Sequence, residues 1–196
     1  MQRADQNAVE AVSLQLVTGQ PVVFRPLGAG DAGILGRYFV GLLDNTTKRF
    51  APHAFDQATA DRLCAELEPL QMLRLIGTRE ADGQEQVIGY FLLCFGVGEG
   101  TTQRYQRHGV ALDPRTDCEV APSVADAFQD QGVGTVFMQQ LLETARRQGR
   151  RRAVLMGGTM ATNSRAIHFY EKLGFRKVGE FETPPGRYNH DMILEL

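Results

Sequence analysis

The run from Gln129 to Thr135, which reads Gln-Asp-Gln-Gly-Val-Gly-Thr, lies directly before a segment whose apolar residues repeat with helical spacing. Glycine has no Cβ, so Gly132 and Gly134 let the backbone approach a ligand closely and adopt dihedral angles that other residues avoid. The first N–H groups of a helix have no acceptor inside it, and the helix dipole adds partial positive charge at that end. The run therefore predicts an anion site suited to a pyrophosphate, although two glycines before a helix can also serve only to turn the chain.

Neither of the two common nucleotide-binding motifs accounts for this run. No Gly-Lys-Ser/Thr sequence follows it, as a P-loop requires, and the third glycine of the dinucleotide-binding fingerprint is missing. Two further segments carry residue types that could do chemistry. Residues 119–124 read Glu-Val-Ala-Pro-Ser-Val, and residues 163–175 read Asn-Ser-Arg-Ala-Ile-His-Phe-Tyr-Glu-Lys-Leu-Gly-Phe.

In order and spacing, these three segments resemble the GCN5-related N-acetyltransferase (GNAT) superfamily. The signature of that superfamily at the start of its central helix is Gln/Arg-x-x-Gly-x-Gly/Ala, which Gln129, Gly132 and Gly134 match. Further along the chain the superfamily has an Asn and a helix that ends in Tyr-x-x-x-Gly-Phe, as residues 163–175 do here. The likeness is strong over residues 118–181, weaker over residues 22–50, and not specific over residues 96–115.

The resemblance implies an α/β fold, in which a central, mixed but mostly antiparallel and twisted sheet is flanked by helices. Residues 13–196 would form this single N-acetyltransferase domain, behind a flexible leader of residues 1–12. In the family, the fourth strand carries a bulge and splays from the fifth, which leaves a cleft for the pantetheine arm of acetyl-CoA. Pro122 fits that expectation, because proline within a strand is tolerated mainly at bulges and edges.

Carried over to this chain, the resemblance implies acetyl-CoA as the cosubstrate. The start of the central helix would hold its pyrophosphate through backbone N–H groups, and the residues concerned are Gln129, Gln131, Gly132, Val133, Gly134 and Thr135. Backbone groups near Val124 would pair with pantetheine, and Asn163 would contact the same arm or support the site. Asn163 could instead cap the helix that follows it, and the two roles are compatible.

Tyr170 is the candidate general acid and is also counted among the residues that contact the cofactor. The resemblance implies direct attack of an amine on the thioester, which expels a thiolate that a phenol O–H can protonate. Taken alone, a tyrosine between Ile167 and Leu173 could equally be a core side chain whose hydroxyl has a partner.

The attacking amine must be neutral, whereas a lysine-like ammonium is almost fully protonated at pH 7, so the reaction needs a base. Glu119 is the first candidate because it lies on the strand that forms the cleft. It could also be a solvated or salt-bridged strand residue. His53 and His108 are the alternative bases.

The periodicity of the sequence predicts the elements that position these residues. Strands are expected at residues 14–17, 22–26, 73–78, 86–95, 118–124, 153–156, 176–182 and 188–196. Helices are expected at residues 34–43, 56–67, 132–148 and 164–173, with Asp31 as the N-cap of the first. Residues 96–115 are glycine-rich and are predicted to form either a long loop or a strand with irregular ends.

Composition excludes several classes of protein. Hydrophobic residues make up 43% of the chain, which is typical of a globular protein, and no apolar stretch approaches the roughly 20 residues of a membrane span. The polar start lacks the pattern of a secretory signal, so a cytoplasmic location is expected. Cys64, Cys94 and Cys118 have no metal-ligand spacing, which indicates free thiols and no metal site.

The net charge of −2 gives the chain no general attraction to nucleic acid or to anionic membranes, and neither is an expected partner. One cluster of arginines stands out, and its members are Arg146, Arg147, Arg150, Arg151 and Arg152. These cations are expected to complement the negative end of a helix, with a phosphate or nucleic-acid contact as the alternative.

The expected function is transfer of an acetyl group from acetyl-CoA to a primary amine on a small molecule or a protein. The alternative is a catalytically silent module that binds acyl-CoA and serves regulation. The acceptor pocket is expected to draw on Tyr38, residues 49–55 and residues 96–115. Arg49, Arg104 and Arg107 hint at an anionic group on the acceptor, although solvated arginine is a common alternative. Relatives often pair, so a homodimer is also expected.

Overall fold

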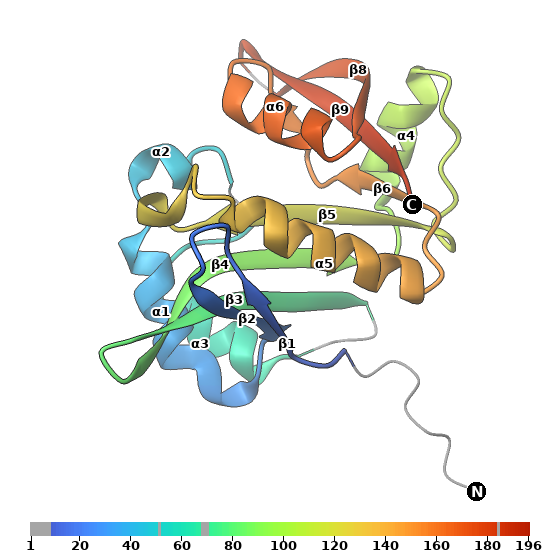
Figure 1. The fold of residues 1–196 in the computed structure, drawn as a ribbon. Coiled ribbons are helices and arrows are strands. Elements are labelled where there is room, and N and C mark those ends of the chain that lie inside the picture. The colour runs from blue at the N-terminus through green and yellow to red at the C-terminus, as the bar shows by residue number, and fades with distance from the viewer. Residues whose placement is uncertain (1–8, 51, 68–70, 184) are drawn as a thin grey trace, which may run out of the picture.

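A single sheet of nine strands runs through the part of the chain that the computed structural model describes, which is residues 9–50, 52–67, 71–183 and 185–196 (Figure 1). The strands are β1 (Val12–Gln15), β2 (Pro21–Pro26), β3 (Met72–Ala81), β4 (Gln84–Cys94), β5 (Asp117–Val124), β6 (Arg152–Leu155), β7 (Thr159–Met160), β8 (Arg176–Thr183) and β9 (Arg187–Glu195). Their order is β1-β2-β3-β4-β5-β6-β9-β7, with β8 on the other edge of β9. Only β5 and β6 pair in parallel, which confirms a mixed, mostly antiparallel sheet.

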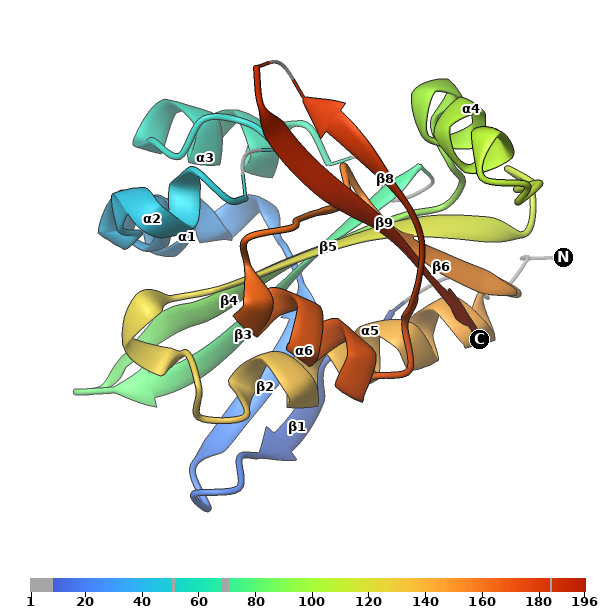
Figure 2. The same cartoon turned by 90° about the horizontal axis from the view of Figure 1, so that it is seen from above.

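Helices cover both faces of this sheet. They are α1 (Ala32–Gly41), α2 (Asp44–Thr47), α3 (Gln57–Ala65), α4 (Glu99–Arg107), α5 (Val133–Arg147) and α6 (Ser164–Lys172). Viewed from above, α5 and α6 lie on one side of the sheet, and α1, α3 and α4 lie on the other (Figure 2). Each side buries its own apolar cluster, as the hydrophobic periodicity of the sequence predicts.

Aromatic packing fixes α5 against the centre of the sheet. The Phe137 ring stacks on Phe24 at a centroid distance of 5.2 Å and meets the edge of Phe91 at 5.7 Å. Gly77 of β3 makes room for it, because a Cβ at that position would lie 2.0 Å from the Phe137 ring. Truncation of such a buried aromatic costs about 3–5 kcal/mol, so this contact anchors the helix that carries the predicted anion site.

Strands β5 and β6 separate halfway along β5. They pair from Asp117–Arg152 to Val120–Leu155, and the Met156 N–H then donates to the Val120 carbonyl at 3.0 Å. The backbone N–H and C=O groups of a strand point to alternate sides from one residue to the next. The backbone groups of Val120, the nitrogen of Pro122 and the backbone groups of Val124 therefore all point toward the β6 side. Pro122 has no N–H to continue the pairing, and the chain of β6 turns away to pair with β9 as β7.

The expected bulge at Pro122 is absent, although the expected splay is present. Along its other edge, β5 pairs with β4 in unbroken register from Val124–Gly89 to Glu119–Cys94. Pro122 lies opposite Phe91 of β4. Its nitrogen, which has no hydrogen to donate, points away from β4. Pro122 therefore ends the pairing of β5 with β6 without breaking a hydrogen bond between β5 and β4, and β5 needs no extra, bulged residue.

Residues 96–115 contain the helix α4, which corrects the expectation of a loop or an irregular strand. Thr101 and Tyr105 are four residues apart and form its buried face. The Tyr105 hydroxyl donates to the Met192 carbonyl at 2.7 Å, which ties the helix to β9. Glu99 in the first turn and Arg104 in the last complement the helix dipole. Together with the buried face, these interactions stabilise a helix despite the low helix propensity of the glycines in the segment.

Element boundaries differ from the predictions in small ways. β1 begins at Val12, two residues before the expected strand, and residues 1–8 of the expected leader lie outside the described chain. The short elements α2 and β7 were not predicted. Asp31 is the N-cap residue of α1, as predicted, but its side chain makes no cap hydrogen bond. Its carboxylate instead binds the Arg25 guanidinium at 2.6 and 2.9 Å and accepts the Gly28 N–H at 2.7 Å.

The arginine cluster at the end of α5 is engaged within the chain. Arg146 and Arg147 pair with Glu143 of the same helix. Arg150 donates to the carbonyl of Arg115 at 2.7 Å, and Arg152 pairs with the buried Asp117 at 2.6 Å. These contacts support the structural interpretation of the cluster. In the described ranges, no helix has both the length and the apolar character needed to cross a membrane. Cys64, Cys94 and Cys118 are free and fully or partly buried.

Candidate functional site

A cavity of about 720 Å³ opens where β5 and β6 part. Its walls come from the end of α2 and the chain after it, the second half of β5, the first turn of α5, the whole length of α6, the chain from the end of β6 to β7, and the strands β8 and β9. Seven of the predicted site residues line it, namely Val124, Gln129, Gly132, Gly134, Thr135, Asn163 and Tyr170. The side chains of Glu119, Gln131 and Val133 are not part of the lining, and Val133 is buried in the core.

The first turn of α5 presents backbone donors to this cavity. Gly132 is the N-cap and has a φ of 80°, a left-handed conformation that favours glycine. Among the described residues, no group accepts a hydrogen bond from the N–H of Val133, Gly134 or Thr135. The Gln131 side chain folds back onto the Ala127 carbonyl at 2.7 Å and leaves these donors uncovered. Unpaired donors beside a positive dipole end fit a pyrophosphate group.

Gln129 holds the anion-binding turn to its neighbours through its side chain. Its Nε2 donates to the Val124 carbonyl at 3.0 Å and to Thr46 Oγ1 at 3.3 Å, and its Oε1 accepts from Arg165. The Val124 carbonyl is thereby occupied, while the Val124 N–H lies on the strand edge that β6 has left. Gln129 thus positions the end of β5 against the start of α5.

Three cationic or titratable side chains of α6 also border the cavity, and the sequence analysis did not assign them to the site. Arg165, His168 and Lys172 follow one another at three- and four-residue spacing, which places them on one face of the helix. Arg165 pairs with Asp130 at 3.2 Å. His168 is exposed, and the helix face that carries it borders the cavity. The helical spacing was the signal that could have identified this basic face.

Asn163 caps α6, as one of its two expected roles requires. Its Oδ1 accepts the Ala166 N–H at 3.3 Å, and its own N–H donates to the Met160 carbonyl at 2.8 Å. The residue also lines the cavity. Its position at the cavity wall is compatible with a contact to a bound ligand in addition to the cap.

Tyr170 combines a packed ring with a hydroxyl that has no polar partner in the described chain. The ring packs edge-on against Phe169 and Phe175 at centroid distances of 5.1 and 5.5 Å. Only 9% of the residue is exposed, yet it lines the cavity. Burial raises the pKa of the Tyr170 phenol, so the hydroxyl keeps its proton at neutral pH.

Glu119 lies on the opposite face of the sheet from α5. Along β5 it shares this face with Ala121 and Ser123, both of which line the cavity. Glu119 is 9% exposed, and no described residue forms a salt bridge or hydrogen bond with its carboxylate. Its carboxylate oxygens nevertheless stay accessible, as a group that exchanges protons must be.

The two alternative bases, His53 and His108, have structural surroundings and do not line the cavity. His53 packs among Phe39, Phe55 and Tyr90, and burial lowers the pKa of its imidazole. His108 lies against Gly179, with its Nε2 at 3.8 Å from Asp191.

The region expected to bind the acceptor is only partly present at the cavity. Arg49, Phe50 and Pro52 line it, whereas Ala51 lies outside the described residues. Tyr38 is buried and contributes through Ser123, whose Oγ lies 2.8 Å from the Tyr38 hydroxyl. No residue of the segment 96–115 belongs to the described lining.

Arg104 in that segment is bound to the buried Asp191 at 3.2 Å, which corrects the expectation that it faces the acceptor. The lining residues Thr159, Thr183, Arg187 and Asn189 were missed, because no spacing within one element relates them to the rest of the site. Their place at the cavity depends on pairing between β7, β8 and β9. In the described chain, no three His, Cys, Asp or Glu side chains are arranged to hold a metal ion.

Solved structures share this architecture over nearly the whole chain. The GNAT domain of PAT from S. lividans superimposes with a TM-score of 0.70 at 18% identity, covering 95% of this chain and 97% of that one. Ribosomal-protein-S5-alanine acetyltransferase from Vibrio fischeri gives a TM-score of 0.71 at 13% identity, with 94% and 96% covered. Aminoglycoside acetyltransferase AAC(6')-Ib, solved with coenzyme A and kanamycin, gives 0.64 at 20% identity, with 89% and 94% covered.

No curated protein is similar enough in sequence to match this chain. The sequence pattern of the acetyltransferase (GNAT) family, however, matches residues 43–175, which are more than half of the chain and contain α5, β5 and α6. The fold agrees with that match, since the similar solved structures have the same mixed sheet and flanking helices. The chain therefore belongs to the acetyltransferase (GNAT) family and is an N-acetyltransferase that uses acetyl-CoA.

Proposed function

We propose that the protein transfers the acetyl group of acetyl-CoA directly to a primary amine, within the cavity between β5 and β6. The observation that carries this proposal is a convergence on one cavity. Unpaired amides of α5, the open edge of β5 and the unpartnered Tyr170 hydroxyl all border it. These are the parts that binding an acyl-CoA and releasing its thiolate require.

The amides of Val133, Gly134 and Thr135 would bind the pyrophosphate, with Arg165 supplying charge from α6. The Val124 N–H would pair with the pantetheine arm, because β6 leaves this edge of β5 free. Bound in this way, acetyl-CoA supplies the acetyl group as a thioester.

Tyr170 would act as the general acid. The amine nitrogen forms a bond to the carbonyl carbon, the C–S bond breaks, and the phenol O–H gives its proton to the departing thiolate sulfur. Burial keeps the Tyr170 phenol protonated at neutral pH, because it raises the pKa of the hydroxyl, and a general acid must carry its proton before the thiolate forms. The phenoxide is then reprotonated from solvent.

Glu119 would accept the proton that the amine loses, through a water molecule. It shares a sheet face with Ala121 and Ser123, both of which line the cavity. The lack of an ion pair in the described chain supports this role, since a carboxylate held by a cation would be a weaker base.

Conversion of Tyr170 to Phe tests the proposal. We expect Tyr170→Phe to lower kcat about 10²–10⁴-fold, as loss of a general acid does. Its affinity for acetyl-CoA in calorimetry should stay within about twofold, because the ring packing is preserved. Tyr188→Phe is the matched control, because Tyr188 is 54% exposed and lies outside the cavity lining. Equal kcat values for the two variants would contradict the assignment.

A further inference from the structure

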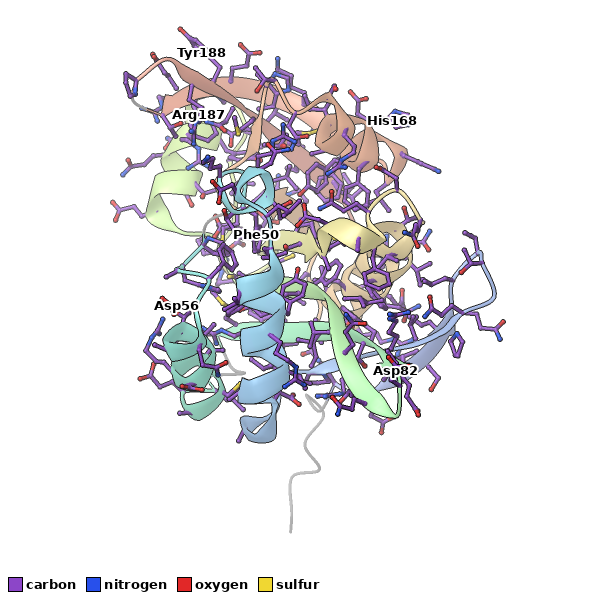
Figure 3. All side chains as sticks on the ribbon, turned by 90° about the vertical axis from the view of Figure 1, so that its left-hand side faces the viewer. Phe50, Asp56, Asp82, His168, Arg187 and Tyr188 are labelled. Atoms are coloured by element: carbon purple, nitrogen blue, oxygen red, sulfur yellow. The ribbon has the colours of Figure 1, made fainter. Side chains whose placement is uncertain are left out.

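The charged residues that line the cavity form two groups, and only one of the groups includes a carboxylate. One group belongs to the anion-binding turn and α6, where the Asp130 carboxylate balances Arg165. The other group comes from the segment after α2 and from the β8–β9 hairpin, and it contains Arg49 and Arg187. Figure 3 shows Arg187 near the end of the hairpin above Phe50, while His168 of α6 lies toward the other side of the view.

Arg49 and Arg187 have no acidic partner in the described chain. No described carboxylate lies within salt-bridge distance of either guanidinium, whereas the neighbouring Lys48 pairs with Asp44 at 3.2 Å. Asp130 supplies the one carboxylate of the described lining, and it is engaged by Arg165. Two arginines that face a cavity without a counter-charge favour a ligand that brings its own negative charge.

Asn189 adds a second, independent feature at the same end. It is 5% exposed and lines the cavity. Its Nδ2 lies 3.0 Å from Thr183 Oγ1 and 3.5 Å from the Arg187 carbonyl. A carbonyl only accepts hydrogen bonds, so the amide must turn its nitrogen toward Arg187. The Asn189 Oδ1 is then left without a donor in the described chain, in a position to accept an N–H from a ligand.

We infer that the acceptor is an amine that also carries a carboxylate, with the carboxylate bound by Arg49 and Arg187 and the amine N–H accepted by Asn189. This inference rests on the proposed acetyl transfer and specifies its substrate class. A polycationic amine would meet two unneutralised guanidinium groups at this end of the cavity, and the one carboxylate of the described lining is already paired with Arg165, so the same site disfavours such an amine. The carboxylate-bearing amine can be a free amino acid or the amino terminus of an acidic peptide.

Matched acceptors test the substrate class. We would compare kcat/KM for γ-aminobutyrate with butylamine, and for lysine with cadaverine, because each pair differs in the carboxylate alone. A charge-assisted pair with arginine predicts a preference of about tenfold or more for the carboxylate member. Two peptides with an aspartate or a lysine after the N-terminal residue, and spermidine as a polycation, complete the panel. A higher rate on the aspartate peptide than on free amino acids would identify the peptide source.

Variants test the residues. Arg49→Gln and Arg187→Gln should each raise the KM of the carboxylate acceptors about tenfold and leave the KM of butylamine and of acetyl-CoA unchanged. Arg176→Gln is the matched control, since Arg176 lies on β8, is exposed and is not part of the lining. Circular dichroism of all three variants checks that the fold is retained.

The outcomes separate this inference from the proposed function. Transfer to butylamine or cadaverine at least as fast as to their carboxylate counterparts, or to spermidine at least as fast as to lysine, would overturn the inference and leave the acetyl transfer intact. A raised KM for acetyl-CoA in the Arg49 and Arg187 variants would also overturn it, because the arginines would then serve a coenzyme phosphate. Binding of acetyl-CoA without transfer to any member of the panel would overturn both.

Discussion

Met156 donates its backbone N–H to the carbonyl oxygen of Val120 at 3.0 Å, and beyond this hydrogen bond β5 and β6 diverge. The divergence coincides with Pro122, whose missing N–H leaves nothing to pair with β6 on that edge. One proline and one change of partner strand thus produce an open strand edge. That edge faces the cavity into which α5 and α6 also point their first turns.

Gly132 is expected to allow the left-handed turn before α5 and to leave the anion site open, and a matched control can separate these two roles. A side chain at its φ of 80° would be strained, so Gly132→Ala should lower the free energy of unfolding by about 1–2 kcal/mol. Gly149→Ala at the other end of α5 should cost a similar amount, because Gly149 has a φ of 72°. Urea denaturation measures both costs. Calorimetry should show weaker acetyl-CoA binding for Gly132→Ala only, and equal weakening in both variants would count against the anion site.

Asn163 can be tested against another helix cap of the same chain. Asn163→Ala removes the acceptor for the Ala166 N–H and should cost about 1 kcal/mol of stability. Asp56→Ala removes the cap of α3, where Asp56 accepts the Thr59 N–H at 2.7 Å, and should cost about as much. If Asn163 also contacts pantetheine, only its variant raises the KM of acetyl-CoA. The same KM in both variants would leave Asn163 with the capping role alone.

Glu119→Gln is expected to lower kcat/KM at neutral pH about 10²–10⁴-fold, because the amine would lose its base. The deficit should shrink as the pH rises, since the neutral fraction of an amine with a pKa near 10.4 grows about tenfold per pH unit. Steady-state kinetics from pH 7 to 9 measure this recovery, and Glu143→Gln on the outer face of α5 is the control. Activity within about twofold of the wild type at pH 7 would rule out Glu119 as the base.

Acid should destabilise the protein through Asp31. Burial alone would raise the pKa of this carboxyl, but hydrogen bonds from Arg25 and from the Gly28 N–H outweigh burial and lower it. A folded-state pKa below the unfolded value of about 3.9 gives stability that is complete above that value and is lost as the pH falls through the folded pKa. We therefore expect the Tm to decrease as the pH is lowered below about 4.

Thermal unfolding of Asp31→Asn checks this expectation. The variant should have a lower Tm than the wild type at pH 7 and a shallower decline in acid. Asp82→Asn is the control, because Asp82 lies in the β3–β4 turn and forms no ion pair with the described residues (Figure 3). Parallel Tm curves for Asp31→Asn and the wild type would show that this carboxylate does not set the acid limit.

Local signals in the sequence predicted much of the fold. The apolar spacing of α5 and α6, the turn of the β3–β4 hairpin and the pattern around Gln129 each depend on residues close together in the chain. The helix α4 was missed because its stability comes from distant partners. Arg104 and Tyr105 are held by Asp191 and Met192 of β9, which no local periodicity reveals.

The candidate site was predictable to a similar extent. Residues of the family's local motifs, such as Gly132 and Gly134 in one and Tyr170 in another, are brought to one cavity, as the resemblance to the family implies. Arg187 and Asn189 come to the cavity through the pairing of β9 with β7 and β8, a long-range arrangement. The acceptor side of a site therefore depends more on tertiary structure than the coenzyme side does, and sequence patterns inform it less.

The claim that the first turn of α5 holds the pyrophosphate is tested most directly by calorimetry with two acyl donors. Acetyl-CoA and S-acetylpantetheine share the thioester and the pantetheine arm, but only acetyl-CoA carries the pyrophosphate together with the adenosine and its 3′-phosphate. Titration of Gly132→Ala beside Gly149→Ala with both donors assigns the difference to the first turn of α5. We expect acetyl-CoA to bind at least about 100-fold more tightly, since several charge-assisted hydrogen bonds would be lost with the truncated donor. Equal affinities for the two donors, or no detectable heat with either, would contradict this account.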